Sequence, residues 1–225
     1  DVELWVVLFT TTLKQPFARW AGRLESHREN LEFALDGHGL PRSLSYLALV
    51  ESGMLPEATS TIGAAGLWQI MPQTAPLLDL RIDWWIDERR DPELSTFAAL
   101  GLLAELHERF GDWSLAMAAY NAGPLPIEEA IARGGTRDFE QLVLHGLVAP
   151  EPRHFVAKVM AAAIVMENAK AFNLEPVSTP TVETTRVPVS GEFELEVLSA
   201  CAGWTPHQFQ RANPPVGRWG TPNQG

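Results

Sequence analysis

The sequence predicts an all-α protein with one globular domain and a short C-terminal appendage. Apolar residues recur at spacings of three and four residues in several segments, which is the period of an amphipathic helix, and a glycine follows most of these segments. The chain has 225 residues, of which 46% are hydrophobic and 20% are charged. This length and balance are typical of one globular domain with roughly fifty residues left for a tail.

Two helices are predicted before residue 54. Residues 17–35 carry apolar side chains at helical spacing, and the glycines that follow are expected to stop this helix. Pro41 opens a second helix, which Gly53 ends. One face of this second helix carries Leu44, Leu47, Ala48 and Glu51. Residues 66–75 are then predicted to form a short helix that Pro72 disturbs.

Three further helices are predicted after an irregular connection at residues 84–92. Ser95 or Thr96 caps a helix that Gly111 closes. Its buried stripe includes Leu100, Leu103, Ala104, His107 and Phe110. Asp112 caps the next helix. One face of that helix carries Trp113, Ala116, Met117 and Tyr120. The alanine-rich residues 155–172 are predicted to form the last strong helix.

These elements divide the chain into three parts. Residues 1–40 are expected to form an N-terminal helical segment that packs on the core, residues 41–173 the main domain, and residues 174–225 a linker and appendage. The linker is rich in proline, and residues 193–213 are predicted to form a pair of helical turns. This pair weakly resembles a glycan-binding LysM unit; an appendage that packs on the main domain is the alternative.

The charge of the chain limits its partners. Its 17 Lys and Arg residues against 28 Asp and Glu residues give a net charge of −11. Such a field repels phosphate backbones and anionic lipid surfaces, so nucleic acid is not expected as a partner. Eight tryptophans fit a sugar-binding surface made of aromatic rings, amides and hydroxyls.

Metal and disulfide chemistry are not expected. The six histidines show no paired spacing, and Cys201 has no second cysteine with which to form a disulfide or a structural zinc site. Cys201 is therefore expected to be a small buried side chain. The apolar residues 1–9 begin with an acid, lack a basic leader and are too short to span a bilayer, so we expect a mature or trimmed chain.

Glu51 is the most informative residue of the sequence. It continues an apolar stripe at the last turn of its helix, where burial and the negative end of the helix dipole both disfavour the charged carboxylate. Both effects raise its pKa from about 4.3 towards roughly 6 or 7, the range that a general acid needs. From periodicity alone, a residue that caps the helix end or pairs with an arginine is the alternative.

Three motifs in chain order add to this interpretation. They are Glu51-Ser52-Gly53, residues 63–72 with the sequence GAAGLWQIMP, and residues 118–123 with the sequence AAYNAG. Together they resemble the core motifs of the lysozyme-like lytic transglycosylases, the goose-type or SLT domain. Residues 84–92 and 110–113 also resemble the membrane-bound type D group. The resemblance covers roughly residues 30–172 and implies an α-helical, lysozyme-like fold.

The resemblance implies an enzyme that cleaves peptidoglycan at the β-1,4 bond between N-acetylmuramic acid and N-acetylglucosamine, leaving a 1,6-anhydromuramic end. Glu51 matches the single acid and base of this reaction, which needs no second carboxylate, cofactor or metal. The implied location is the periplasm, or the outer membrane facing the periplasm. A catalytically silent peptidoglycan-binding scaffold and a lysozyme-like hydrolase are the alternatives. Oligomeric state and endo or exo cleavage stay open.

The family motifs also assign substrate-binding residues. Ser52 orients the glutamate or caps its helix; Gln69 and Met71 line the sugar groove, with core packing as the alternative for Met71. The hydroxyl of Tyr120 is expected to reach the catalytic carboxylate, although a core tyrosine is the alternative. Asn121 is expected to contact sugar, or to be there because asparagine is common before a helix-ending glycine.

Residues 151–156 resemble a fourth family motif, with one departure. The family usually has a tyrosine where this chain has Phe155, so any hydroxyl contact there is lost. Glu151 is expected to bind substrate, or only to favour the positive end of its helix. A second departure is Pro124, where relatives often carry another glycine, so the edge of the groove is expected to differ in shape.

Overall fold

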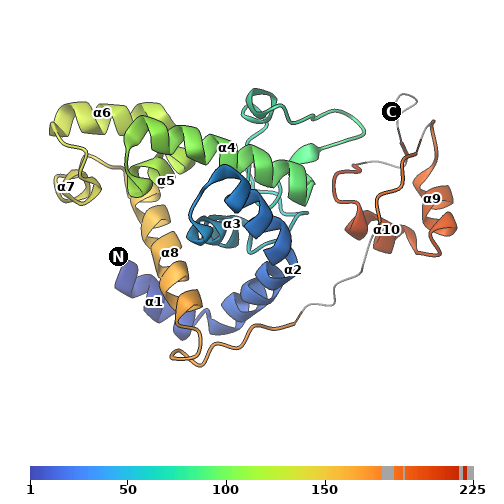
Figure 1. Ribbon diagram of the computed structural model, residues 1–225, viewed down its shortest axis with the longest axis horizontal. Helices are drawn as coiled ribbons and strands as arrows, with labels where there is room; N and C mark the ends of the chain where they lie inside the picture. Colours follow the sequence, from blue (N-terminus) through green and yellow to red (C-terminus); the bar gives the residue numbers. More distant parts are fainter. Residues whose placement is uncertain (179–184, 190, 218–219, 222–225) are drawn as a thin grey trace.

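A computed structural model of the protein describes residues 1–178, 185–189, 191–217 and 220–221 (Figure 1). Within these residues the regular structure is helical, and the extended pairings are isolated β-bridges. The all-α prediction is confirmed. The α-helices are α1 (Val2–Thr10), α2 (Lys14–His38), α3 (Ser45–Ser52), α4 (Pro92–Phe110), α5 (Trp113–Ala122), α6 (Pro124–Gly134), α7 (Phe139–Leu144), α8 (Pro150–Glu167), α9 (Leu195–Cys201) and α10 (Pro206–Ala212).

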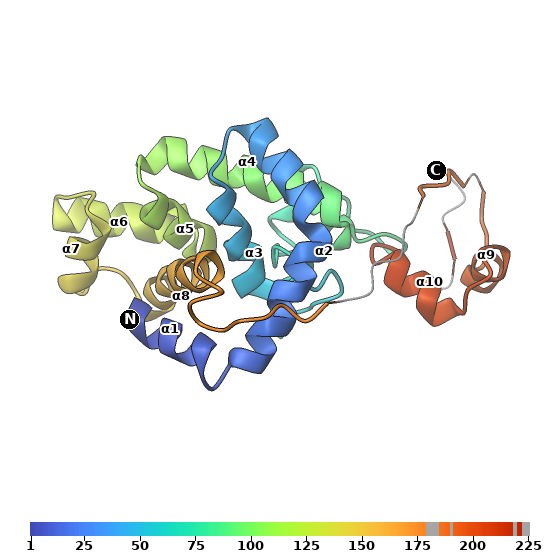
Figure 2. The ribbon, with the colours of Figure 1, turned by 60° about the horizontal axis from the view of Figure 1, so that its bottom comes forward.

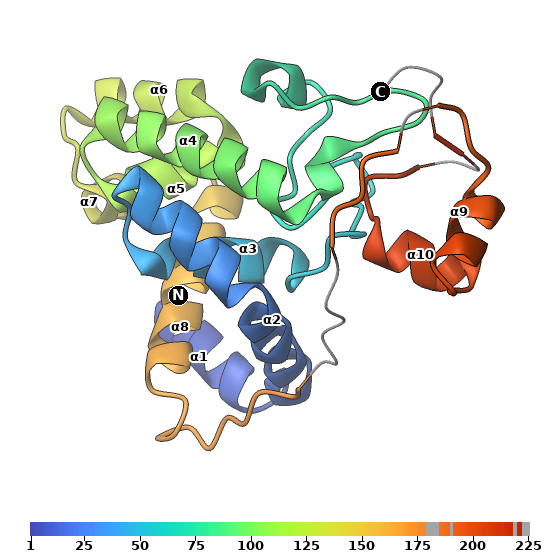
Figure 3. The same cartoon turned by 45° about the vertical axis from the view of Figure 1, so that its right-hand side comes forward.

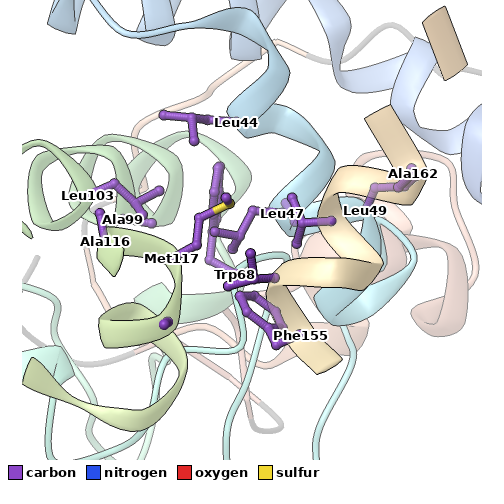
Figure 4. Packing of buried hydrophobic residues seen from close by; sticks show 14 of the residues in the cluster. Leu44, Leu47, Leu49, Trp68, Ala99, Leu103, Ala116, Met117, Phe155 and Ala162 are labelled. Atoms are coloured by element: carbon purple, nitrogen blue, oxygen red, sulfur yellow. The ribbon is translucent and has the colours of Figure 1, made fainter. Parts of the chain in front are cut away.

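The helices of the main domain pack around α3 and α8. Helix α8 packs against α1, α3 and α5, while α4 packs against α2 and α5 (Figures 1 and 2). Leu47 and Leu49 of α3, with Trp68 from the following loop, are fully buried among these helices (Figure 4). Since burying one such side chain contributes about 1.5–3 kcal/mol, this core determines where α3 lies. No helix among the described residues is both long and apolar enough to cross a membrane.

Helix ends follow the predicted capping residues at most boundaries. The carboxylate of Asp112 accepts a hydrogen bond from the backbone N–H of Leu115 at the start of α5, as predicted. Gly53 ends α3 with a φ of 60°, in the left-handed region that favours glycine. Helix α2 is longer than predicted: it runs through Gly37 and ends at His38.

Helix α4 begins earlier than predicted. Asp91, not Ser95 or Thr96, is its N-cap: the Asp91 carboxylate accepts hydrogen bonds from the N–H groups of Glu93 and Leu94 at 2.9 and 3.0 Å. Pro92 fits the first helical position because its φ angle is already helical. Ser95 and Thr96 are buried inside the helix, and their hydroxyls donate to carbonyls four residues earlier.

The predicted helix over residues 66–75 is wrong. Gly66 and Gln69 have φ angles of 83° and 49°, and Ala65 forms an antiparallel bridge with Ile70. A side chain at Gly66 would place its Cβ 1.8 Å from the backbone oxygen of Arg89. This contact between distant parts of the chain forces a tight loop, which local apolar spacing does not reveal.

Other boundaries also differ from the prediction. Helix α8 covers Pro150–Glu167, not residues 155–172, because Pro150 opens it and the Asn168 side chain donates to the Ile164 oxygen at its end. Helices α6 and α7 were not predicted, and α1 was expected only as part of the helical N-terminal segment 1–40. Residues 193–213 form the predicted pair, α9 and α10. Cys201 of α9 is exposed, which corrects the expectation of a buried thiol, because this small helix buries only Leu195 and Ser199.

Residues 191–217, here called the C-terminal unit, lie at one end of the molecule beside the segment that precedes α4 (Figure 3). Two backbone hydrogen bonds of 2.9 Å connect them: Gly217 N–H donates to the Trp85 oxygen, and Asp87 N–H donates to the Pro215 oxygen. The appendage therefore docks on the main domain through a short backbone pairing.

Candidate active site

Glu51 lies in the last turn of α3, where the chain turns sharply. A Cβ atom at Gly53 would lie 2.7 Å from the indole of Trp20, so only glycine fits there without a shift. Arg23 of α2 donates from Nε to the Gly53 carbonyl oxygen at 2.6 Å. The end of α3, and with it Glu51, is therefore held against α2 by both shape and a charged hydrogen bond.

Burial raises the pKa of the partly buried Glu51 carboxyl to about 7. The positive charge of Lys158 opposes this rise, whereas the negative charge of Glu151 adds to it. Both residues belong to α8, which packs against α3. The predicted elevation is confirmed in direction, and Glu51 can hold a proton near neutral pH.

Lys158 is itself positioned by α1. Its ammonium nitrogen lies 4.7 Å from the centre of the Trp5 ring, within the range of a cation–π interaction. Helix α1 packs along α8 and supplies this tryptophan. The N-terminal helix thus determines the position of a charge that acts on Glu51.

Tyr120 of α5 lies near Glu51, but its hydroxyl has a different partner from the one expected. The hydroxyl donates to the Trp68 carbonyl oxygen at 2.8 Å. Burial, and then the charge of Glu51, raise the pKa of Tyr120 well above its usual value, so the phenol stays protonated. The predicted approach to the carboxylate is therefore a through-space charge interaction and not a hydrogen bond in this structure.

Arg89, which the sequence analysis did not single out, organises the loop of the second motif. Only 6% of it is exposed, and its guanidinium donates to the carbonyl oxygens of Gly63 and Ile70 at 2.8 and 2.9 Å. It also donates twice to the Asp87 carboxylate, with both distances 2.8 Å. These four hydrogen bonds from one buried side chain connect residues 63–70 to residues 87–89. Its place in residues 84–92, a charged segment that resembles the membrane-bound type D group, was a signal that could have singled it out.

The second motif is also anchored by its tryptophan. Trp68 is fully buried, and its indole N–H donates to the Thr96 hydroxyl at 2.9 Å. Gln69, next in the chain, donates from its side-chain amide to the Gly66 oxygen at 2.9 Å. Met71 is partly buried. The predicted residues Gln69 and Met71 thus lie on a loop held in place by Trp68 and Arg89.

Ser52 has the contacts of a helix cap. Its hydroxyl donates to the Ala48 oxygen at 3.2 Å and accepts from the Leu55 N–H at 3.2 Å. These bonds close the end of α3, so they favour the capping alternative over a direct bond to Glu51.

Asn121, at the end of α5, has an unfilled hydrogen-bonding position. Its side-chain oxygen Oδ1 is buried and has no hydrogen-bond partner within the described part of the chain. An unsatisfied buried oxygen costs about 1–3 kcal/mol, so this side chain is held at a cost to stability.

The fourth motif lies at the start of α8. Glu151 is exposed in the first turn of this helix, and its charge acts on Glu51. Phe155 is 7% exposed and packs with the core residues around Trp68 (Figure 4). The position for which the fourth motif predicts a tyrosine therefore serves core packing here. Among the described residues, no group of three or more His, Cys, Asp and Glu side chains is placed to hold a metal ion.

Comparison with known proteins agrees with this geometry. The family model of the transglycosylase SLT domain matches residues 32–143. Membrane-bound lytic murein transglycosylase D of Escherichia coli K12 is 36% identical over 170 residues, which are 73% of this chain and 37% of that protein.

Solved structures show the same fold. The lytic transglycosylase Slt of Pseudomonas aeruginosa, an inactive mutant, superposes with a TM-score of 0.55 and 25% identity over 68% of this chain and 25% of that one. The 70 kDa soluble lytic transglycosylase of Escherichia coli gives a TM-score of 0.55 and 25% identity over 67% and 25%. The chain thus spans 37% of the curated relative and a quarter of each solved chain. It belongs to the transglycosylase SLT domain family, with a lysozyme-like helical fold.

Proposed function

We propose that this protein is a lytic transglycosylase of peptidoglycan. It cleaves the β-1,4 bond between N-acetylmuramic acid and N-acetylglucosamine and leaves a 1,6-anhydromuramic end. The observation that carries the proposal is the position of Glu51, a partly buried carboxyl with a pKa of about 7 at the first family motif. Membership of the SLT domain family, and relatives named lytic murein transglycosylases, support the same reaction class.

The proposed reaction uses Glu51 twice. Protonated Glu51 donates its proton to the glycosidic oxygen as the bond to the muramic C1 breaks. The resulting carboxylate then takes the proton of the C6 hydroxyl, whose oxygen forms the new bond to C1. Glu51 is protonated again at the end, and no water is consumed. A pKa near the working pH suits both steps, because neither protonation state is strongly favoured.

The neighbours of Glu51 have complementary roles in this proposal. Lys158 stabilises the transient carboxylate, whereas Glu151 and the burial of the site favour the protonated form. Tyr120 stays neutral, and its hydrogen bond to the Trp68 carbonyl oxygen holds the loop of the second motif against α5. We assign substrate contact to Gln69, Met71, Asn121 and Glu151, and helix-end positioning to Ser52.

The three-part organisation is also a proposal. Residues 41–173 form the catalytic part, and residues 1–40 pack against α8 and α3 and support them. Residues 174–225 form the appendage. The name of the curated relative, a membrane-bound murein transglycosylase, supports an envelope location, which we take to be the periplasm or the periplasmic face of the outer membrane.

Digestion of purified peptidoglycan tests the reaction directly. The chain and its Glu51→Gln variant are incubated with sacculi, and the masses of the released muropeptides are measured by mass spectrometry. We expect products lighter by one water than hydrolysed ends, from the unmodified chain only. Hydrated ends would instead identify a hydrolase, and binding without release would identify a peptidoglycan-binding scaffold.

A further inference from the structure

The C-terminal unit is joined to the main domain by a short extended pairing. The N–H of Asp87 donates to the Pro215 oxygen at 2.9 Å. The N–H of Gly217 donates to the Trp85 oxygen, also at 2.9 Å. The two segments run antiparallel, and Figure 3 shows the unit beside the segment that leads into α4. The unit thus adds one extended segment to the edge of the main domain.

The segment that receives this pairing is a small hairpin of the main domain. Ile82 and Asp87 form an antiparallel bridge, and the Asp83 carboxylate accepts two backbone N–H groups in the turn. Residues 81–84 of this hairpin are exposed. Since an isolated two-stranded hairpin is only marginally stable in water, a third extended segment along its edge stabilises it. Residues 215–217 lie along that edge.

Asp87 connects this hairpin to residues 63–72, here called the substrate loop. The backbone of Asp87 is extended, with a φ of −126° and a ψ of 92°. Its carboxylate accepts two hydrogen bonds of 2.8 Å from the guanidinium of Arg89. Arg89 in turn donates to the carbonyl oxygens of Gly63 and Ile70. One buried guanidinium therefore connects a residue held by the C-terminal unit to both sides of the substrate loop.

The substrate loop also contacts the candidate active site. The Trp68 carbonyl oxygen accepts the hydroxyl of Tyr120, which lies near Glu51, at 2.8 Å. Gln69 and Met71, to which we assigned substrate contact, lie one and three residues after Trp68. The contacts thus lead from the C-terminal unit through the hairpin and the substrate loop to the active site.

We propose that the docked C-terminal unit is a positioning element for the substrate loop. Residues 215–217 hold Asp87, and Asp87 holds Arg89 against the loop. The coupling itself is a property of the fold, whereas its effect on substrate binding rests on the proposed function. Because the unit acts only through the loop, loss of its pairing weakens substrate binding and leaves the bond-breaking step at Glu51 unchanged.

A substitution at Gly217 breaks the pairing at one atom. Gly217→Pro has no N–H to donate to the Trp85 oxygen. Gly217→Ala is the matched control, because it keeps the N–H and its Cβ would lie 3.7 Å from the Trp85 oxygen, an ordinary contact. Both variants are made in the full chain, and circular dichroism melting establishes a temperature at which both are folded.

Amide hydrogen exchange measures the substrate loop directly and needs no activity. The N–H groups of Ala65, Gly66 and Ile70 are hydrogen-bonded to carbonyl oxygens, so their exchange reports opening of the loop. Gly217→Pro is expected to speed this exchange about two- to tenfold, the factor that corresponds to the loss of one hydrogen bond. Gly217→Ala is expected to leave it unchanged. Equal exchange rates in the two variants would overturn the proposal.

Cleavage of a short soluble peptidoglycan fragment measures the effect on the site. A short fragment is chosen because a long polymer could also contact other parts of the chain. Relative to Gly217→Ala, we expect Gly217→Pro to raise KM about two- to tenfold and to leave kcat unchanged. A fall in kcat at unchanged KM contradicts the proposal. If the unmodified chain cleaves no fragment, the proposed function fails, and the exchange rates still decide the coupling.

A disulfide across the pairing supplies a rescue. Ile86 and Val216 form an antiparallel bridge between the two backbone hydrogen bonds. Such pairs have Cα atoms about 4.5 Å apart, within the range of a disulfide. Ile86→Cys and Val216→Cys are therefore added to Gly217→Pro, together with Cys201→Ser to remove the exposed thiol. Oxidation should return the exchange rate and KM to the control values, and reduction should reverse this. An oxidised protein that stays as impaired as Gly217→Pro would refute the positioning role.

Discussion

The helical layer around α3 and the irregular segment 54–90 are held in place by different forces. In the helical layer, side chains such as Leu47 and Ala48 are fully buried and pack on neighbouring helices. In the irregular segment, Arg89 connects three backbone and side-chain positions, and Met54, Gln69 and Asp79 have positive φ angles. The site therefore combines a helix that is held mainly by apolar contacts with a loop that is held mainly by the hydrogen bonds of Arg89 and Trp68.

This contrast matters because the loss of a single group affects the two regions differently. An apolar core loses part of its stability when one side chain is truncated, and the surrounding atoms partly compensate. A buried charge network loses several bonds at once and leaves its other members unpaired. We expect the rate of the bond-breaking step to depend on the helices that hold Glu51. We expect the shape of the substrate site to depend on the hydrogen bonds that Arg89 makes with Gly63, Ile70 and Asp87.

The largest effect is expected from Glu51→Gln, because it removes the proton donor of the helical layer. Turnover of peptidoglycan should fall about 10²–10⁴-fold, the usual contribution of a general acid. Rates are measured from the release of soluble muropeptides, and binding of sacculi is measured in parallel as a control. Retention of more than a tenth of the activity would move the catalytic role to another residue.

Replacing Arg89 with Met tests the irregular segment. The change removes the guanidinium donor from Asp87 and from the oxygens of Gly63 and Ile70. Asp87 keeps its contact with Arg90, so the free energy of unfolding should fall by about 3 kcal/mol, the lower end for a broken buried pair. Denaturant titration gives this value. Leu47→Ala, a matched loss in the helical layer, should cost about 2–5 kcal/mol. At temperatures where both variants are folded, only Arg89→Met should raise KM strongly; equal KM values would contradict the comparison.

Because the pKa of Glu51 is raised in the fold, the free energy of unfolding should fall as the pH rises from about 4.5 to above 7. Its pKa rises from 4.5 when exposed to about 7 in the fold, so folding favours the protonated carboxyl. That contribution is complete below about pH 4.5 and is lost as the pH rises through about 7. Glu51→Gln should therefore be more stable than the unmodified chain at pH 8, by up to about 3 kcal/mol, with little difference at pH 4. Unfolding curves at several pH values give the difference, and a pH-independent gap would show that the carboxyl is not desolvated.

The smallest effect is expected from Lys158→Met. The Lys158 charge lowers the pKa of Glu51, so removing that charge should raise the pKa. Glu151 and Tyr120, the other groups that interact with Glu51, are not altered by this variant. The alkaline limb of the kcat/KM profile should move upward by about one pH unit or less. Trp5→Phe keeps an aromatic face under Lys158 and serves as the control. A downward movement of the limb would reverse the assigned sign.

The helices of the site could be predicted from the sequence, but the loop between them could not. Apolar spacing and the caps Gly53, Gly111 and Asp112 are local signals, and each ends or begins a helix in the structure. The apolar stripe also placed Glu51 at a buried helix end. Residues 66–75 have apolar spacing too, yet they form a loop because Gly66 is pressed against the Arg89 backbone.

The sequence by itself determined the all-α class, the order of the three motifs and the direction of the Glu51 pKa shift. The helical pattern depends on residues within one or two helical turns of each other, and the apolar stripe of α3 already indicates that Glu51 faces the core. The burial that raises its pKa comes from helices packed on α3, among them α8. Only the tertiary structure decided the role of Arg89, the Trp68 partner of Tyr120, the position of Lys158 over the Trp5 ring and the docking of the C-terminal unit. Those contacts join residues far apart in the chain, and hydrogen-bond partners at such separations are chosen by packing.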